Sequence, residues 1–455
     1  MADRVIKGAL VALETGAETI DVSISGETIA GLHAPGTAPD AADVIDATGL
    51  WLLPGGIDAH THFTAHPEGA AEEFRDGTGG AAAAGVTTVI EMPHALPPAT
   101  DPEGFEFKRR YCAQNAMVDF ALWAGLDGEN AAQIPALAQL GAAGFKGFMC
   151  SPIKDGAAPD ATALPALDDG ALLEAMRAAA AIGGLIGIHS ENHQILLAAR
   201  AGLLGDGRQD IRAHALSGPE LAEVEAVQRL VLFARETGAR THVVHMASAR
   251  AADILRDARH KADLSAETCM HYLCLDEEDL VRIGPVARCG PPLRPRAVAD
   301  ALWERVLAGH IDMLASDHCP YPPELKRADR PIWEAGMGLT GVETNLPLLL
   351  SEGVIGRGLP LAQAARMSAG APARRFGLSR KGAIRPGLDA DLTLWDPNGQ
   401  KQVCGADFRG RAKFSAFEGW TMKGRLLRTI LRGRDIFRDD EILGAPGQGK
   451  FVRPG

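Results

Sequence analysis

Short apolar runs alternate with Ala- and Leu-rich stretches through the middle of the chain. Near-continuous apolar runs of this kind are typical of parallel strands that are buried on both faces. Eight of them, each five or six residues long, span residues 55–60, 86–91, 118–123, 144–149, 185–190, 241–245, 264–268 and 311–316. The stretches between them have the length and spacing of helices, for example 170–182, 219–238 and 295–309. Eight strand–helix units predict a closed (β/α)8 TIM barrel.

The two ends of the chain follow a different pattern. Residues 1–53 alternate in short β-like pieces broken by Gly and Pro, and residues 381–455 do the same. Because the ends resemble each other and differ from the middle, we expect them to fold together into one composite β-sandwich domain. The expected fold class is therefore α/β, with the barrel over residues 54–380. We expect active-site loops in the long connections after three of the strands, at 65–73, 151–165 and 321–336.

The composition indicates an ordinary globular protein with a small-molecule partner. Of the 455 residues, 46% are hydrophobic and 23% are charged, which is inconsistent with disorder. No apolar run reaches the roughly eighteen residues of a membrane-spanning helix, and the first residues lack the features of a secretory signal, so we expect a cytoplasmic protein. The net charge of −12 disfavours nucleic acids and anionic membranes, because both attract clustered Lys and Arg. The seven cysteines form no C-x-x-C pair, so neither a disulfide framework nor a structural zinc site is indicated.

Six side chains at the predicted strand ends have the chemistry of metal ligands. His60 and His62 are two residues apart, so in a strand both imidazoles point to the same side and could hold one cation. In (β/α)8 barrels the reactive groups gather at the carboxyl ends of the strands. Imidazole and carboxylate ligands suit zinc, or its neighbours cobalt, manganese and iron. We therefore expect a centre for two divalent metal ions formed by His60, His62, Lys146, His189, His245 and Asp317.

Lys146 is the unusual member of this set. A protonated amine would repel two cations, so we expect the neutral amine to take up CO₂ and become N6-carboxylysine, whose carbamate can bridge them. Each residue also has an ordinary interpretation. A single His at a barrel rim is more often hydrogen-bonded within the protein, a single Lys usually pairs with a carboxylate, and Asp317 could cap a helix. Because five strand ends each carry a residue that can bind a metal, we favour the metal centre over these ordinary interpretations.

A series of motifs extends along nearly the whole chain: GGIDAHTH, GVTTVIEMP, GFKGFM, IHSEN, ETCMHYL, CGPPLRP, ASDHCPYPPELK, GAIRPGLDADLTLWDP and GWTMKGRLLRTILRG. Together they resemble the cyclic amidohydrolases, a family that includes allantoinases, hydantoinases, dihydropyrimidinases and dihydroorotases. The resemblance implies a barrel with a β-sandwich, two divalent metals and a homotetramer. It also implies that His60 and His62 hold one metal, that His189 and His245 hold the other, and that carboxylated Lys146 bridges them.

Within that family the chain is most similar to allantoinases, through IEMP, FKGFMC, SDHCPYPPE and GRLLRTILRG. Thr64 stands where dihydroorotases carry an Arg, and Ser151 stands where hydantoinases and dihydropyrimidinases usually carry a Tyr. The chain also departs from allantoinases, since it has His94 and Ala95 where they read Leu-Asn and Gly290 where they have a Ser. The resemblance therefore favours allantoin and leaves hydantoin-type and other cyclic amide rings open. We expect substrate contacts from Ser151, His94, Cys289, Gly290, His318 and Gly341, with His66 as a further loop residue.

The expected reaction is hydrolysis of a carbon–nitrogen bond in a cyclic amide or ureide. The two cations would lower the pKa of water and polarise the scissile carbonyl group. Asp317, which the resemblance adds to the first metal site, would carry the proton to the leaving ring nitrogen. Two rival interpretations remain open. One is a catalytically silent assembly protein on the same fold, and the other is a mononuclear, deaminase-type hydrolase with a single metal.

Overall fold

The centre of the molecule is a sheet of eight parallel strands, seen here in a computed structural model that describes residues 2–64, 73–94, 97–151 and 164–455. The strands follow one another in chain order around the sheet. They are β6 (Gly56–Thr61), β7 (Val86–Glu91), β8 (Asp119–Gly125), β9 (Gly144–Phe148), β10 (Leu185–His189), β11 (Arg240–Val243), β12 (Leu264–Thr268) and β13 (Met313–Leu314). All eight lie at the positions predicted from the apolar runs.

The first and last strands meet and bring the two edges of this sheet together. Thr61 forms a parallel bridge with His318, and the backbone N–H of His62 donates to the carbonyl oxygen of His318 at 2.8 Å. Behind this bridge, the N–H of Ser316 donates to Asp58 Oδ1 at 3.0 Å. Every residue of β6, β7, β8 and β10 is buried, which is why these strands read as nearly continuous apolar runs.

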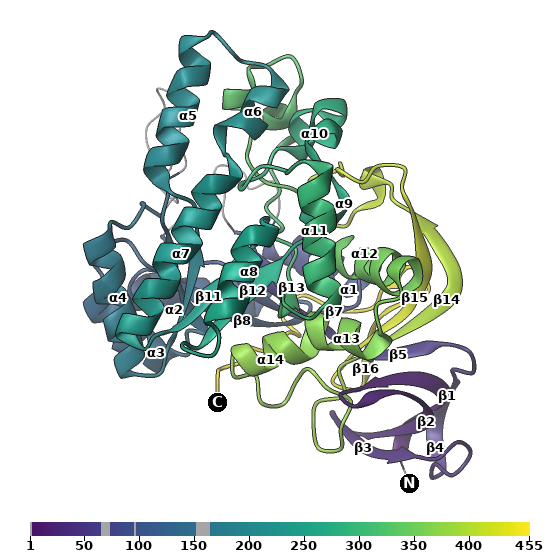
Figure 1. Cartoon of the computed structure of the whole chain (residues 1–455). Coiled ribbons are helices and arrows are strands. Elements are labelled where there is room, and N and C mark those ends of the chain that lie inside the picture. The colour runs from purple at the N-terminus through teal and green to yellow at the C-terminus, as the bar shows by residue number, and fades with distance from the viewer. Residues whose placement is uncertain (1, 65–72, 95–96, 152–163) are drawn as a thin grey trace.

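Helices pack around the sheet and connect its strands (Figure 1). The predicted helices at 170–182, 219–238 and 295–309 correspond to α4 (Asp169–Ala181), α7 (Glu220–Thr237) and α11 (Arg296–Leu307). Asp101, Asp168 and Asn192 cap α2 (Pro102–Asn115), α4 and α5 (His193–Gly205), each accepting a hydrogen bond from an amide of the first turn. The α-helices are α1 (Phe74–Ala83), α2 (Pro102–Asn115), α3 (Ile134–Leu140), α4 (Asp169–Ala181), α5 (His193–Gly205), α6 (Ile211–Ser217), α7 (Glu220–Thr237), α8 (Ala249–Ala258), α9 (Met270–Cys274), α10 (Glu277–Ile283), α11 (Arg296–Leu307), α12 (Asn345–Leu348), α13 (Leu361–Ala365) and α14 (Ala371–Arg375). Within the described residues, none of these helices is both long enough and apolar enough to cross a membrane.

The N-terminal and C-terminal strands share a second, mixed sheet, as predicted (Figure 1). The chain enters the barrel from this sheet through Gly55 alone, between β5 (Trp51–Pro54) and β6. The two ends join where β14 (Leu392–Gln402) pairs antiparallel with β5, and the core beneath them includes Ile6, Val22, Leu392 and Ile430. The strands of this sheet are β1 (Ala2–Leu13), β2 (Gly16–Ser25), β3 (Thr28–His33), β4 (Ala41–Asp46), β5 (Trp51–Pro54), β14 (Leu392–Gln402), β15 (Thr421–Leu431), β16 (Arg434–Arg438) and β17 (Glu441–Ile442). The domain limits at 53/54 and 380/381 stay a prediction.

A buried ion network joins the barrel to the composite sheet. The Lys381 ammonium lies 2.8 Å from Asp119 at the start of β8 and 2.5 Å from Asp391, and all three side chains are buried. Arg432 also pairs with Asp119. The N–H of Lys450 donates to Asp119 at 2.8 Å, so the C-terminal segment is tied to the same point. The carboxylates gathered here face cationic side chains, which makes this cluster a structural junction.

Candidate metal centre

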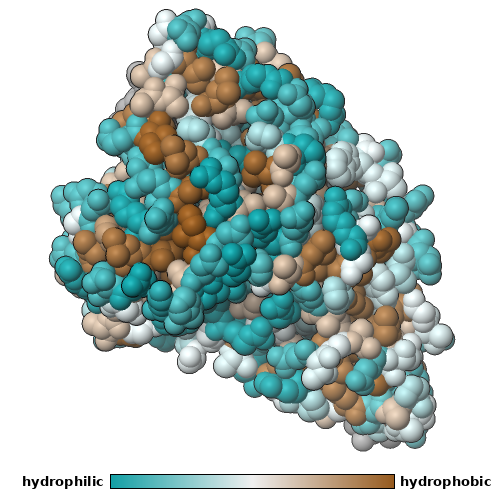
Figure 2. All heavy atoms as spheres, viewed as in Figure 1, coloured by the Kyte–Doolittle hydropathy of each residue, from teal (hydrophilic) through white to brown (hydrophobic). Residues whose placement is uncertain are grey.

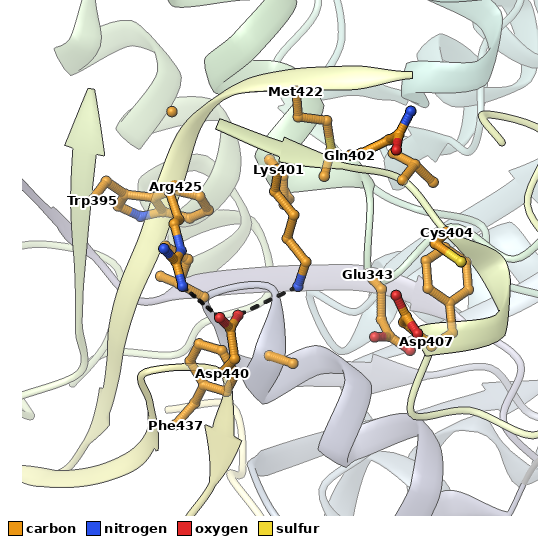
Figure 3. Close-up of a pocket in the computed structure, with 16 residues that line it drawn as sticks. Glu343, Trp395, Lys401, Gln402, Cys404, Asp407, Met422, Arg425, Phe437 and Asp440 are labelled. Carbon is orange, nitrogen blue, oxygen red and sulfur yellow. Dashed lines mark hydrogen bonds and ion pairs between the residues drawn. The ribbon is translucent and has the colours of Figure 1, made fainter. Parts of the chain in front are cut away.

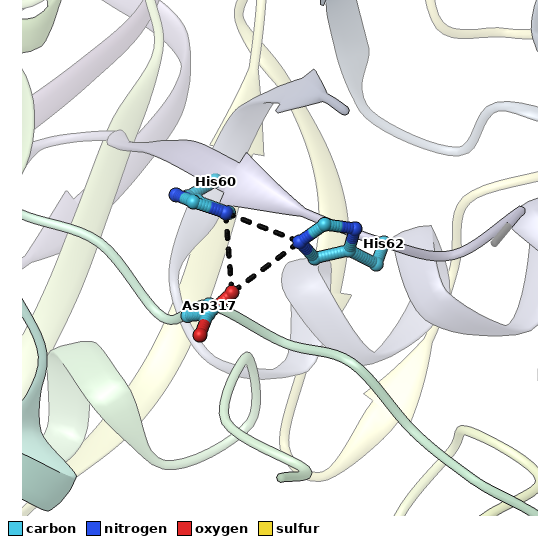
Figure 4. A group of neighbouring side chains, drawn as sticks. All are labelled: His60, His62 and Asp317. Carbon is cyan, nitrogen blue, oxygen red and sulfur yellow. Dashed lines mark hydrogen bonds and ion pairs between the residues drawn. The ribbon is translucent and has the colours of Figure 1, made fainter. Parts of the chain in front are cut away.

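His60, His62 and Asp317 converge at the rim of the barrel (Figure 4). His60 and His62 come from the end of β6, and Asp317 follows β13. The Nε2 atoms of the two histidines are 3.1 Å apart, and Asp317 Oδ1 lies 3.1 Å from His60 Nε2 and 3.3 Å from His62 Nε2. Three ligand atoms that point at one another in this way fit a single divalent cation.

His189 and His245 form a second pair beside the first. His189 ends β10, and His245 follows β11. His189 Nδ1 and His245 Nε2 are 3.0 Å apart. The His60 ring is 5.1 Å from the His62 ring and 5.2 Å from the His245 ring, and His245 is 4.6 Å from His189, measured between ring centroids. The structure thus brings the four predicted histidines into one continuous row.

Lys146 lies on β9 with its amine enclosed next to this row. The residue is fully buried, and Nζ has no hydrogen-bond partner among the described residues. The amine sits 4.3 Å from the centroid of the Phe148 ring. Burial lowers the pKa of Lys146 to about 8, although Asp317 and Glu267 favour the charged form. A buried amine without a partner that loses its proton readily has the chemistry needed to react with CO₂.

Two of the predicted ligands have left-handed backbone conformations. The φ angle is 36° at His245 and 48° at Asp317. Few residues other than glycine adopt such angles, and in folded proteins they concentrate at functional sites where the surrounding structure holds them. Both residues stand where the chain leaves a strand, so the unusual backbone aims their side chains into the centre.

Sequence reasoning missed the buried carboxylates that surround these ligands. Glu267 at the end of β12 is 2.6 Å from His60 Nδ1, and Glu191 is 2.8 Å from His189 Nε2. Glu91 at the end of β7 accepts hydrogen bonds from Thr61 Oγ1 at 2.7 Å and from the N–H of Thr64 at 3.0 Å. A carboxylate at the end of an otherwise apolar strand, as in VTTVIE and LSAET, is the signal that could have identified two of them.

Three of the predicted substrate contacts lie in the loops around the rim. Ser151 Oγ accepts a hydrogen bond from the N–H of Ala166 at 2.9 Å. The Cys289 carbonyl accepts one from His214 Nε2 at 2.8 Å, and burial raises the pKa of the Cys289 thiol to about 12. A Cβ at Gly290 would lie 3.1 Å from the sulfur of Met337, so the backbone there packs closely against the loop after the last strand.

The other predicted contacts lie beside the first histidine pair. His94 is 5.0 Å from the His62 ring, measured between centroids, and its Nδ1 finds no hydrogen-bond partner within the described part of the chain. His318 Nδ1 accepts hydrogen bonds from the backbone N–H groups of Gly341 at 3.0 Å and Val342 at 3.1 Å. Most of two predicted loops lies outside the described residues, namely 65–72 with His66 and 152–163, and so does Ala95.

A separate cavity lies between the composite sheet and the barrel (Figure 3). Trp395 and Met422 line it, and Asp440 pairs there with Arg425 at 2.5 Å and with Lys401 at 3.7 Å. None of the predicted metal ligands or substrate contacts lines this cavity. Lys401, Arg425 and Asp440 are thus engaged with one another, and the histidine row remains the place with the chemistry of a reactive site.

Comparisons with known proteins show what the chain is similar to. The family described as "Amidohydrolase family" matches residues 51–436. An allantoinase from Rubrobacter xylanophilus is 40% identical over 454 residues, and the match covers 99% of this chain and 98% of the length of the allantoinase. An L-hydantoinase from Paenarthrobacter aurescens is 32% identical, covering 99% of this chain and 98% of its own. Among solved structures, an L-hydantoinase (dihydropyrimidinase) from Arthrobacter aurescens is similar with a TM-score of 0.94 at 32% identity, covering 100% of both chains.

Proposed function

The chain belongs to the amidohydrolase family, and from this premise we propose that it opens the ring of a cyclic ureide by hydrolysis, with allantoin as its substrate and allantoate as its product. The observation that carries the proposal is the convergence of His60, His62 and Asp317 at the barrel rim, next to the pair of His189 and His245. Six relatives named allantoinase, 35–40% identical over nearly the full chain, support allantoin.

We propose that two divalent cations, zinc in the first instance, occupy this centre. His60, His62 and Asp317 would hold one, and His189 and His245 the other. Lys146, carboxylated on its buried amine, would lie between them. When bound, such cations lower the pKa of water and polarise a carbonyl group. The donor set fits them, because the imidazole nitrogens face one another and the one amine among them is without a hydrogen-bond partner in the described residues.

The side chains of the protein supply the movement of the proton and the position of the ring. Asp317 is 13% exposed, and its carboxylate lies against both rings of the first histidine pair. Its carboxylate can accept the proton of the attacking water and deliver it to the departing ring nitrogen. The partly buried rings of His94 and Phe148, 5.4 Å apart between centroids, lie against the rings of His62 and His189 and restrict the entry of bulk water beside the histidine row.

A substrate panel tests the proposal. The metal-loaded chain is assayed with allantoin, 5-substituted hydantoins, dihydrouracil, dihydroorotate and simple cyclic imides, and ring opening is followed by absorbance and by product analysis. We expect kcat/KM to be highest for allantoin. If no ring is opened by a chain that holds its metals, the hydrolase proposal is wrong and the result favours a catalytically silent assembly protein.

Hydantoin hydrolysis is the second candidate. The structural similarity to the L-hydantoinase, with a TM-score of 0.94, favours it, since rings of the two substrate classes differ by only a few contacts. Ser151 argues against hydantoin hydrolysis, because hydantoinases usually carry a Tyr at this position. A kcat/KM for a 5-substituted hydantoin above that for allantoin would decide for this candidate.

We also propose a cytoplasmic homotetramer. Exposed leucines on α5 and α7 support the assembly, because a partner subunit could cover them: Leu197, Leu204, Leu221 and Leu232. Figure 2 shows apolar patches over this side of the molecule, separated by hydrophilic surface. Light scattering on the purified chain should give about four times the chain mass of 47.9 kDa, whereas a single chain mass would contradict the assembly.

A further inference from the structure

We infer that Glu267 is a positioning residue that couples the two halves of the proposed metal centre. The inference rests on the proposed function, which supplies the metals, and names a side chain to which the resemblance assigns no role. Glu267 lies at the end of β12 and is fully buried. One of its oxygens, Oε1, reaches a side chain in one half of the centre and the backbone of the other half.

In the first half, Glu267 fixes the tautomer of His60. Glu267 Oε1 is 2.6 Å from His60 Nδ1. A carboxylate can only accept a hydrogen bond, so Nδ1 carries the proton and Nε2 of the neutral ring keeps its lone pair. That Nε2 is the atom that faces His62 Nε2 and Asp317 Oδ1, each at 3.1 Å. Glu267 therefore presents His60 in the form that can bind a cation.

In the second half, Glu267 holds the backbone of His245. The N–H of His245 donates to Glu267 Oε1 at 3.2 Å, at the residue whose φ angle is 36°. An unfavourable backbone angle persists only when its surroundings hold it, and this hydrogen bond is one such restraint. His245 Nε2 then faces His189 Nδ1 at 3.0 Å.

A third contact keeps the carboxylate itself in place. Glu267 Oε2 accepts from His242 Nε2 at 3.1 Å, and His242 Nδ1 is 2.8 Å from Ser265 Oγ. The hydroxyl can donate to Nδ1, which fixes His242 as a donor toward Glu267. Both oxygens of Glu267 are thus occupied by donors, and the side chain has one orientation.

The test compares Glu267→Gln with a matched variant, Glu223→Gln, in the full-length chain. Glu223 is also a buried carboxylate, and it accepts from the N–H groups of Ala247 at 2.8 Å and Ser248 at 3.2 Å, close to His245 in the chain. It has no hydrogen bond to a ligand histidine among the described residues. Each chain is loaded with Co²⁺ and dialysed against increasing chelator, while metal content, visible absorption and thermal midpoint are measured.

We expect Glu267→Gln to lose the first Co²⁺ at 10- to 100-fold lower chelator concentration than wild type, with a changed absorption spectrum. Glu223→Gln should hold both ions as wild type does, even if its thermal midpoint falls as far as that of Glu267→Gln. Should Glu267→Gln fail to fold, Glu267→Asp replaces it, since the shorter side chain keeps its charge but withdraws from His60. Equal metal retention in wild type and Glu267→Gln, or equal loss in Glu223→Gln, overturns the inference. Fewer than two Co²⁺ ions in the wild-type chain would instead refute the proposed two-metal centre, and this inference with it, whereas the substrate panel tests the ring-opening function separately.

Discussion

At the scale of single residues, the proposed centre depends on Lys146, because buried amines are normally hydrogen-bonded and this one has no partner among the described residues. Lys146 is fully buried and its amine has no hydrogen bond to the described residues, which is costly unless the amine is neutral or modified. We expect Lys146→Ala to hold fewer than two metals per chain and to lose turnover. Added formate or acetate should restore part of both, because a small carboxylate can take the position of the carbamate. Elemental analysis with and without the additive measures this, and full loading of the unsupplemented variant would exclude a bridging role.

Asp317 gives the second prediction at this scale. Asp317→Asn keeps the size of the side chain but removes the acceptor for the proton. We expect kcat to fall by about 10²- to 10⁴-fold with the thermal midpoint nearly unchanged. Steady-state kinetics and thermal unfolding, run on the same preparation, separate catalysis from stability. Near-normal turnover would remove Asp317 as the residue that moves the proton.

At the scale of elements, a buried lysine joins two loops of the barrel rim. Lys326 ends the short helical turn Pro323–Lys326, and its Nζ donates to the carbonyl oxygens of Pro285 at 3.1 Å and Arg288 at 3.2 Å. Burial, with a smaller effect from Arg288, lowers the pKa of Lys326 to about 7 from its usual value of 10.5. Between these two values the unfolded chain binds a proton that the folded chain does not.

The sign of the pH effect follows from that difference. Stability linked to a lowered lysine pKa is complete above pH 10.5 and is lost as the pH falls to about 7. The unfolding free energy of wild type minus that of Lys326→Met should therefore rise by about 1.4 kcal/mol per pH unit from pH 7 upward. Chemical denaturation of both proteins at pH 7, 8 and 9 provides the values. Parallel pH profiles of the two proteins would show that Lys326 does not titrate in this window.

The elements that positioned the site could be predicted because their sequences obey one simple rule. Strands buried on both faces must be apolar, and a parallel sheet aligns their carboxyl ends. The sequence therefore predicts that His60, His189 and Asp317 lie at the same rim of the barrel. The last strand is shorter than its apolar run, since the ladder covers only Met313–Leu314, although Ala315 N still donates to Thr268 O at 3.0 Å. The left-handed turn at Asp317 then carries the chain away from regular pairing.

The contacts made across the fold could not be predicted in this way. Glu267 is separated from His60 by 207 residues, and a single letter at the end of a strand does not say which distant ring it will meet. The ion network around Lys381 could not be predicted either, because its members come from three parts of the chain: Asp119, Lys381 with Asp391, and Arg432. Loop residues such as Ser151 and Gly290 depend on backbone paths that no periodicity encodes.

At the scale of the whole molecule, that ion network holds the two sheets together. Lys381→Met would leave the buried carboxylates of Asp119 and Asp391 without their shared cation. We expect the unfolding free energy to fall by about 3–5 kcal/mol. Arg374→Met is the control, since Arg374 pairs with Glu14 at 3.4 Å on the surface and its loss should cost less than about 1 kcal/mol. Equal losses in the two variants would contradict a structural role for the network.

The proposed chemistry depends on the two cations that the histidine row is proposed to hold. Anomalous diffraction from crystals of the zinc-loaded chain, grown with bicarbonate and measured at the zinc absorption edge, tests this directly. We expect two peaks per chain, one between His60, His62 and Asp317 and one between His189 and His245, with density for a carboxylated Lys146 between them. A single peak would favour a mononuclear hydrolase, and a row of histidines without any peak would contradict the proposed chemistry.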